Sequence, residues 1–416
     1  MKTLLIIGYV WPEPNSSAAG ARMLQLIRSF QLMGFSIHYA SPAQASPHAI
    51  NFSDFNIKPH SIEVNHSGFD GFCQALNPQV VLFDRFMMEE QFAWRVEKTC
   101  PNALRILDTE DLHGLRYARQ ALAKNNDKVI TDVALSDLLS ERFVRELAAI
   151  YRCDLTLMIS QYEMELLRNT IGVPNDILHY LPFMLDQTQP SANTITFEQR
   201  QHFVSIGNFR HEPNWDAVVQ LKQTIWPIIK KALPQAQLHI YGAYPPKKAT
   251  QLHNQQQGFF VKGWCEDAFE VLRRTRVLLA PLRFGAGLKG KLLDAAQCGT
   301  PMVTTSIGAE GIFQEQYPEI KADDFNQFAE QAIALYNNPE NWHQAQQNGH
   351  DMLKQFTFKQ HHEPLAERIE QLLANTVEHR LHNITGAMLR HNSMKSTQYM
   401  SQWIEVKNQL AEQSKG

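Results

Sequence analysis

The chain has 416 residues, of which 44% are hydrophobic and 19% charged, and its formal net charge at pH 7 is −3. A chain of this length predicts two domains and a terminal extension rather than one core. The small net charge excludes a general attraction to nucleic acid, so a phosphate ligand would have to be bound by a few placed side chains. The five cysteines are dispersed without a C-x-x-C pair, which indicates reduced intracellular thiols rather than a disulfide framework or a zinc site.

The first residues, MKTLLIIGYVWPEP, contain a short apolar run. We interpret it as a first buried strand, because no small-residue cleavage site of a signal peptide follows it. No apolar window approaches the roughly 20 residues that span a bilayer. We therefore expect a soluble, cytoplasmic protein, with peripheral contact at the inner membrane face as the minority alternative.

Short apolar runs alternate with helical patterns along the rest of the chain. In the first half, the predicted strands cover residues 4–9, 37–41, 80–84, 104–108, 155–160 and 177–181. A polar, aperiodic segment at 186–194 predicts a linker. In the second half, the predicted strands cover residues 202–207, 237–242, 259–263, 277–282 and 302–306, with helical segments such as 215–232 between them.

Strands that are apolar throughout and separated by helices predict parallel sheets covered on both faces. Two such series predict an α/β fold in which two doubly wound, Rossmann-like domains, residues 1–188 and 196–356, face each other across a cleft. Residues 357–416 are predicted to form helices, the first part of which crosses back to the N-terminal domain. Their last part carries an apolar stripe, for which we expect packing against the body or in a homodimer, with membrane docking as the alternative.

The stretch RFGAGLKGKLLDAAQCGTP, residues 283–301, follows a predicted strand and predicts a tight turn and a helix start. Its glycines would let backbone N–H groups approach an anion, and the helix N-terminus adds partial positive charge. Arg283 and the two lysines that follow the glycines could close over phosphate oxygens. Asp294 is placed to accept hydrogen bonds from ribose hydroxyls.

The glycine spacing, Gly-x-Gly-x-x-Gly, is also that of a dinucleotide fingerprint. Two observations argue against NAD. A dinucleotide fingerprint follows the first strand of its domain, whereas this one follows the fourth, and the pyrophosphate of NAD does not require three basic side chains. The pattern therefore favours a nucleoside diphosphate attached to another group.

The longer stretch RFGAGLKGKLLDAAQCGTPMVTTSIGAEGI resembles the donor-site signature of retaining glycosyltransferases of the GT-B fold, family 4. Four further motifs are similar to other parts of that family: PNSSAAG (14–20), LDTEDLH (107–113), MISQYE (158–163) and VSIGNFRHEPNWD (204–216). The resemblance covers roughly residues 1–370. It implies an acceptor-binding N-terminal domain, a C-terminal domain that binds a nucleotide sugar, and transfer with retention of configuration to a glycan, lipid-linked or protein acceptor.

The resemblance also implies a role for each candidate residue. Arg210 and Lys291 would hold the donor diphosphate and stabilise the leaving group, while His113 would contact the transferred sugar. Asp294 would bind ribose, Glu310 would lie near the diphosphate or sugar, and Trp264 would flank the nucleobase. The donor-binding candidates are Gly20, Arg283, Gly285, Ala286, Gly287, Leu288, Lys289, Asp294, Glu310 and Trp264.

The acids Asp108, Glu110 and Asp111 could suggest a metal. We expect neither a metal nor a cofactor beyond the nucleotide-sugar co-substrate, because the resemblance implies that protein cations neutralise the phosphates.

Two positions depart from the family pattern. Ala286 stands where the family has the first acid of an acid–seven residues–acid pair, and Asn214 stands where it commonly has a basic residue. These departures leave two alternatives open: a GT-B nucleotide-sugar epimerase, and a non-catalytic protein that binds nucleotide.

Overall fold

The computed structural model describes residues 2–126, 128–186, 195–313 and 320–414. The first sheet has the order β3-β2-β1-β4-β5-β6-β7 and the second has the order β10-β9-β8-β11-β12; all paired strands run parallel. The strands are β1 (Lys2–Ile7), β2 (Phe35–Ser41), β3 (Ile57–Ser61), β4 (Val80–Asp84), β5 (Leu104–Asp108), β6 (Leu155–Met158), β7 (Leu178–Tyr180), β8 (Gln201–Ile206), β9 (Leu238–Tyr241), β10 (Phe259–Gly263), β11 (Thr275–Ala280) and β12 (Met302–Thr304).

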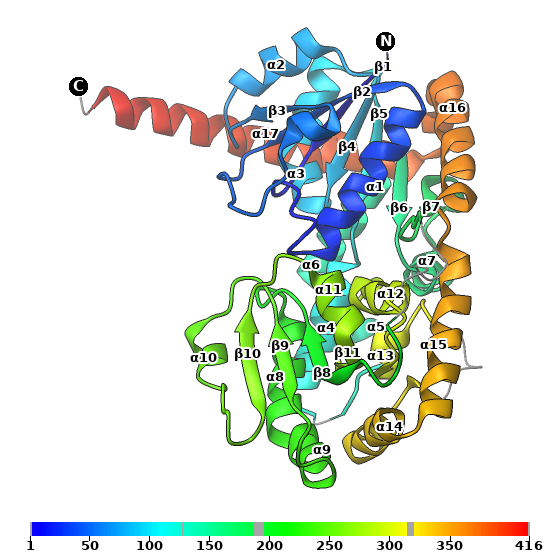
Figure 1. Cartoon of the computed structure of the whole chain (residues 1–416). Helices are drawn as coiled ribbons and strands as arrows, with labels where there is room; N and C mark the ends of the chain where they lie inside the picture. The colour runs from blue at the N-terminus through cyan, green and yellow to red at the C-terminus, as the bar shows by residue number, and fades with distance from the viewer. Residues whose placement is uncertain (1, 127, 187–194, 314–319, 415–416) are drawn as a thin grey trace.

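Helices cover both faces of each sheet (Figure 1). They are α1 (Ala18–Leu32), α2 (Gly68–Leu76), α3 (Phe86–Thr99), α4 (His113–Lys124), α5 (Leu135–Leu138), α6 (Glu141–Arg152), α7 (Gln161–Glu165), α8 (Glu212–Gln220), α9 (Trp226–Ala232), α10 (Lys247–Thr250), α11 (Ala268–Arg274), α12 (Gly290–Gln297), α13 (Ser306–Ala309), α14 (Phe325–Asn337), α15 (Pro339–Leu353), α16 (Phe358–His382) and α17 (Ile384–Gln413).

Alternation along β1 shows why these strands are apolar throughout. Leu5 and Ile7 pack into a core beneath α2, α3 and α6, whereas Leu4 and Ile6 pack into a second core beneath α1 and α16. Successive side chains point to opposite faces of a sheet, so a strand covered on both sides must be apolar at every position. The predicted α/β architecture of two doubly wound sheets is confirmed.

The sequence pattern missed β3, which forms an edge of the first sheet beside β2. Its sequence is IKPHS, and most of its residues are partly or fully exposed. Pro59 cannot donate a ladder hydrogen bond, which confines proline to edge strands and bulges. An edge strand of this kind lacks the apolar run that marked the others.

The chain crosses between the domains twice, and the two crossings lie side by side. The Leu185 N–H donates to the Phe356 carbonyl at 2.7 Å, and the Phe358 N–H donates to the Leu185 carbonyl at 2.9 Å. Most of the predicted linker, residues 187–194, lies outside the described residues. After the second crossing, α16 packs Leu365 and Ile369 into the core of the first domain. The first domain therefore includes a helix from the C-terminal part of the chain.

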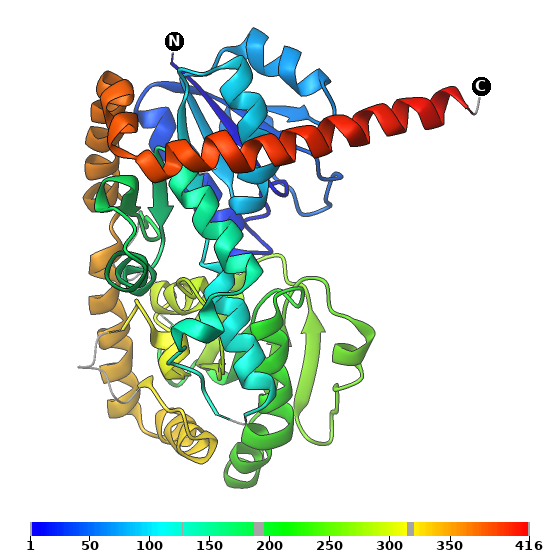
Figure 2. The same ribbon diagram turned by 180° about the vertical axis from the view of Figure 1, so that it is seen from behind.

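Helix α17 packs against α3 and α6 and then runs past the body of the protein (Figure 2). Its near half is fixed by contacts such as the Asn383 side chain to the Tyr151 carbonyl at 2.7 Å. Its far half exposes Tyr399, Trp403 and Leu410. Among the described helices, none combines the length and apolar character needed to cross a membrane.

Candidate active site

A cavity of about 1600 Å³ lies between the two domains. The first domain lines it with the β1–α1 loop and with residues that follow β4 and β5. The second domain lines it with the β8–α8 loop and with the Gly-rich loop and α12. These segments follow the carboxyl ends of parallel strands, which is where doubly wound sheets bind ligands.

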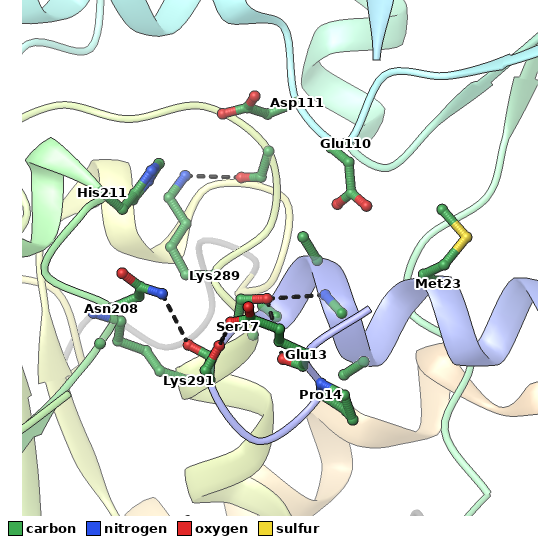
Figure 3. A pocket seen from close by; sticks show the side chains of 18 of the residues that line it. Glu13, Pro14, Ser17, Met23, Glu110, Asp111, Asn208, His211, Lys289 and Lys291 are labelled. Carbon is green, nitrogen blue, oxygen red and sulfur yellow. Dashed lines mark hydrogen bonds between the residues drawn. The ribbon is translucent and has the colours of Figure 1, made fainter. Parts of the chain in front are cut away.

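Two lysines define the wall of the cavity that belongs to the second domain. Lys291 donates to the Asn214 side-chain oxygen at 2.6 Å, and burial lowers its pKa to about 8. Lys289 donates to the Gly287 carbonyl at 2.8 Å, and burial lowers its pKa as well. Figure 3 shows Lys289, Asn208 and His211 gathered on one side of the pocket, with Glu110 and Met23 on the other. This wall can therefore offer ammonium groups to an anion.

Arg210 and Asp294 also line the cavity. The Arg210 guanidinium is exposed and stacks 3.5 Å from the Tyr244 ring centroid, and no ion pair engages it among the described residues. Asp294 lies on α12, and burial raises the pKa of its carboxyl to about 7. The predicted cation and acid are thus both available to a ligand.

The Gly-rich loop lies against the first domain. The Gly287 N–H donates to Glu163 at 2.7 Å, and the Gly285 carbonyl accepts from Arg119 at 2.9 Å. A Cβ at Gly287, where φ is +62°, would lie 2.9 Å from the Asp111 Cβ, and one at Gly290 would lie 2.8 Å from the Ala18 Cβ. Since real Cβ atoms do not approach that closely, these glycines permit close contact between the domains.

Ala286 and Leu288 occupy the same loop and line the cavity with largely buried side chains. Ala286 belongs to the core of the first domain. An acid at that position would face an apolar neighbourhood, so alanine suits this packing.

Arg283 and Glu310 do not line the cavity, unlike the other predicted site residues. Arg283 pairs with Asp216 at 2.5 Å and donates to the Asn126 carbonyl of the first domain at 2.8 Å. Glu310 accepts from both terminal nitrogens of Arg119, at 2.9 and 2.7 Å. Both side chains hold the domains together here, an arrangement that does not favour the direct donor contact that the resemblance implied. That contact remains a prediction.

His113 begins α4 on the opposite wall. Its N–H donates to the buried Glu146 carboxylate at 2.9 Å, and its Nε2 lies 3.4 Å from Asp111. Burial lowers its pKa to about 3, with a contribution from neighbouring arginines, so the imidazole is neutral at physiological pH. A neutral imidazole can donate or accept a hydrogen bond to a sugar hydroxyl without adding charge.

Gly20 and Trp264 complete the predicted set. A Cβ at Gly20 would lie 2.4 Å from the Glu13 backbone, so the turn after β1 requires glycine. The Gly20 N–H is used by Ser17, which caps α1. Trp264 donates to the Asn15 carbonyl at 3.3 Å and packs on His48 of the first domain. Both residues line the cavity where the domains meet.

Sequence patterns missed several arginines of the first-domain wall, namely Arg85, Arg142 and Arg145. Only the position of Arg85 directly after a predicted strand gave a signal. No group of three or more acids, histidines or cysteines that could hold a metal occurs in the described part of the chain. Asp108, one of the suspected acids, is buried in an ion pair with Arg22 at 2.8 Å.

Residues 200–338 match the family model described as glycosyl transferases group 1. A search of curated proteins found no match.

Solved structures share the architecture at low identity. HepE of Anabaena in complex with UDP and glucose has a TM-score of 0.68 at 9% identity, covering 89% of this chain and 100% of the other. A TarM mutant of S. aureus, in complex with fondaparinux, alpha-GlcNAc-glycerol and UDP, has a TM-score of 0.65 at 8% identity, covering 90% and 100%. Sucrose-phosphate synthase of Thermosynechococcus elongatus has a TM-score of 0.63 at 14% identity, covering 90% and 100%.

The predicted GT-B fold is therefore confirmed, and the family match indicates a glycosyltransferase. Within that class, residues 200–338, which lie in the second domain, are similar to the glycosyl transferases group 1 family.

Proposed function

We propose that this protein transfers a sugar from a nucleotide-diphosphate sugar to an acceptor hydroxyl with retention of configuration and without a metal ion. The observation that carries the proposal is the placement of Lys289 and Lys291 at the start of α12, on the second-domain wall of the cavity, while His113 lines the same cavity from the first domain. The acceptor is a glycan, a lipid-linked molecule or a protein. No cofactor takes part beyond the donor.

The chemistry requires positive charge at the leaving group. As the bond between the anomeric carbon and the β-phosphate oxygen breaks, negative charge develops on the phosphate, and Lys291, Lys289 and Arg210 supply compensating cations. The acceptor oxygen bonds to the anomeric carbon on the face that the phosphate leaves, and its proton passes to a phosphate oxygen. His113, which stays neutral, positions a sugar hydroxyl.

UDP is the first nucleotide to test. The HepE structures contain UDP, UDP with glucose, and UDP-glucose, and the TarM complex contains UDP. We place the reaction in the cytoplasm, and the exposed far half of α17 is the candidate surface for a homodimer or for peripheral contact with the inner membrane face.

A thermal-shift panel of UDP-, GDP- and ADP-sugars tests donor binding. We expect one class to raise the melting temperature, and Lys291→Ala and Arg210→Ala each to weaken its apparent affinity about 10- to 100-fold, the range expected for losing a charged hydrogen bond. Lys231→Ala is the matched control, because this exposed lysine at the end of α9 does not line the cavity. Unchanged affinity in both cavity variants would refute the donor site.

Product analysis separates the proposal from its alternatives. With the best donor and an acceptor panel, we expect a glycoside whose anomeric configuration matches the donor, at an unchanged rate in the presence of a chelator. Conversion of the sugar without any acceptor would instead indicate an epimerase. Nucleotide binding without turnover of any sugar donor would indicate a non-catalytic protein.

A further inference from the structure

Four arginines of the first domain line the cavity: Arg85, Arg116, Arg142 and Arg145. They come from three places in the chain, because Arg85 follows β4, Arg116 lies on α4 and the other two lie on α6. Three of them, Arg116, Arg85 and Arg142, lie close enough to His113 for their charges to lower its pKa, after the larger effect of burial. The fold thus gathers guanidinium groups around the residue predicted to contact the sugar.

Two of the four arginines are neutralised by the protein itself. Arg116 pairs with Asp111 at 2.7 Å, and Arg145 pairs with Glu90 at 2.6 Å. These ion pairs leave little binding capacity for a ligand.

The other two arginines are less closely engaged by acids. Arg142 contacts the Tyr117 ring at 4.7 Å, and no ion pair engages it among the described residues. Arg85 forms only a long ion pair with Asp84, at 3.7 Å and without a hydrogen bond, and its guanidinium lies 5.2 Å from the Tyr9 ring. Within the described ranges, no hydrogen bond satisfies either guanidinium.

Arg85 is the more informative of the two, because its side chain is only 16% exposed. A guanidinium carries five N–H donors in a planar fork, and those of Arg85 make no hydrogen bond to the described residues, so they can serve a ligand. Its backbone has φ +71°, a left-handed conformation that costs about 1–3 kcal/mol in a residue with a side chain and that is found in clusters at functional sites. The fold therefore holds this fork at the cavity at a cost in stability.

We propose that the acceptor carries a phosphate group, and that Arg85 and Arg142 bind it. This inference rests on the proposed function and names the acceptor class for the same cavity. The two arginines belong to the first-domain wall, whereas the lysines that would hold the donor diphosphate belong to the second. Forked guanidinium donors match phosphate oxygens in geometry and charge. The acceptor's phosphate, bound by these two arginines near His113, would then orient the acceptor hydroxyl.

Methyl phosphate is the probe, because it carries the phosphate group and does not require the rest of the acceptor to be known. Phosphorus NMR would measure its line broadening at constant ionic strength, with UDP present at saturation to fill the donor site. We expect broadening with the unmodified protein, and at least a tenfold weaker apparent affinity in Arg85→Gln and in Arg142→Gln. Arg168→Gln is the matched control, because Arg168 is exposed and lies outside the cavity lining.

The outcomes separate the two proposals. The proposed phosphate site at Arg85 and Arg142 would be overturned if the unmodified protein caused no broadening. It would also be overturned if both cavity variants caused the same broadening as the unmodified protein. Stronger competition by acetate than by inorganic phosphate would also overturn it, in favour of a carboxylate acceptor. Failure of UDP to raise the melting temperature would count against the proposed function. In that case the same NMR series is run in the Lys291→Ala background, which removes a donor-site cation, and it still tests whether Arg85 and Arg142 bind phosphate.

Discussion

Asp294 and Lys291 lie three residues apart on α12, and burial moves both pKa values toward neutrality, to about 7 and about 8 respectively. If Asp294 accepts ribose hydroxyls, its deprotonated form binds the donor better. If Lys291 holds phosphate, its protonated form does so. The two groups therefore impose opposite pH limits on one binding event.

We predict that the affinity for UDP-glucose, or for the sugar nucleotide that binds best, follows a bell-shaped pH curve. It rises as the pH increases through about 7, where Asp294 loses its proton, and falls above about 8, where Lys291 loses its own. Each limb approaches about a tenfold change per pH unit for a single titrating group. Isothermal titration between pH 5.5 and 9.5 measures the curve.

Two substitutions assign the limbs of that curve. Asp294→Asn should flatten the acidic limb, because an amide does not titrate, and Lys291→Arg should move the basic limb beyond the measured range. A curve whose two limbs persist in both variants would show that other groups control donor binding.

At the scale of elements, the N-termini of α12 and α1 contact each other at the border of the cavity. Gly290 of α12 approaches Ala18 of α1 so closely that an added Cβ would lie 2.8 Å from the Ala18 Cβ and 3.4 Å from the Phe183 ring. Backbone of the second domain can reach the first only because this position lacks a side chain. The contact brings together the two walls of the cavity, one from each domain.

We predict that Gly290→Val holds the domains apart. Turnover should fall at least about tenfold, because misplaced reacting groups lose their alignment, and small-angle scattering should show a larger radius of gyration. Gly71→Val is the matched control, because it places the same side chain in helix α2, where an added Cβ meets nothing within 4 Å. A Gly290 variant with unchanged turnover and radius would show that this contact does not govern closure.

For the whole molecule, the segment from α4 to α5 joins the domains. It leaves the first domain and lies beside elements of the second (Figures 1 and 2), where the Ile130 N–H donates to the Arg283 carbonyl at 2.8 Å. Arg119 is fully buried and binds Glu310, the Gly285 carbonyl and the Thr131 carbonyl. One side chain thus connects three segments.

We predict that Arg119→Gln lowers the free energy of unfolding by about 3–5 kcal/mol, because it leaves the Glu310 carboxylate without its partner in a largely buried position. Guanidinium chloride unfolding followed by fluorescence and circular dichroism measures the loss. Arg168→Gln, at an exposed position, should change stability by less than about 0.5 kcal/mol. A loss below about 1 kcal/mol for Arg119→Gln would contradict the assigned role.

Local pattern was enough to predict most of the fold. The strands at 80–84 and 104–108 have the predicted bounds, because a strand buried on both faces is a largely apolar run. The strand at 259–263 also has the predicted bounds, although it is a partly exposed edge strand, because its first three residues are apolar. The helical pattern at 215–232 corresponds to α8, a π-helical turn and α9. The pattern failed at β3, where an edge position relaxes the need for apolar residues.

The sequence by itself determined which candidate residues gather at the cavity near the strand ends. Arg210, Lys291, Asp294 and His113 all line the cavity, since the carboxyl ends of parallel strands meet at one edge of each sheet. Only the tertiary structure decided that Gly287, Arg283 and Glu310 serve contacts between the domains. Their partners Glu163, Asn126 and Arg119 lie more than 100 residues away in the chain. Local propensity carries no information about such pairings, because the energy of a buried ion pair or close glycine contact exists only after the two domains have come together.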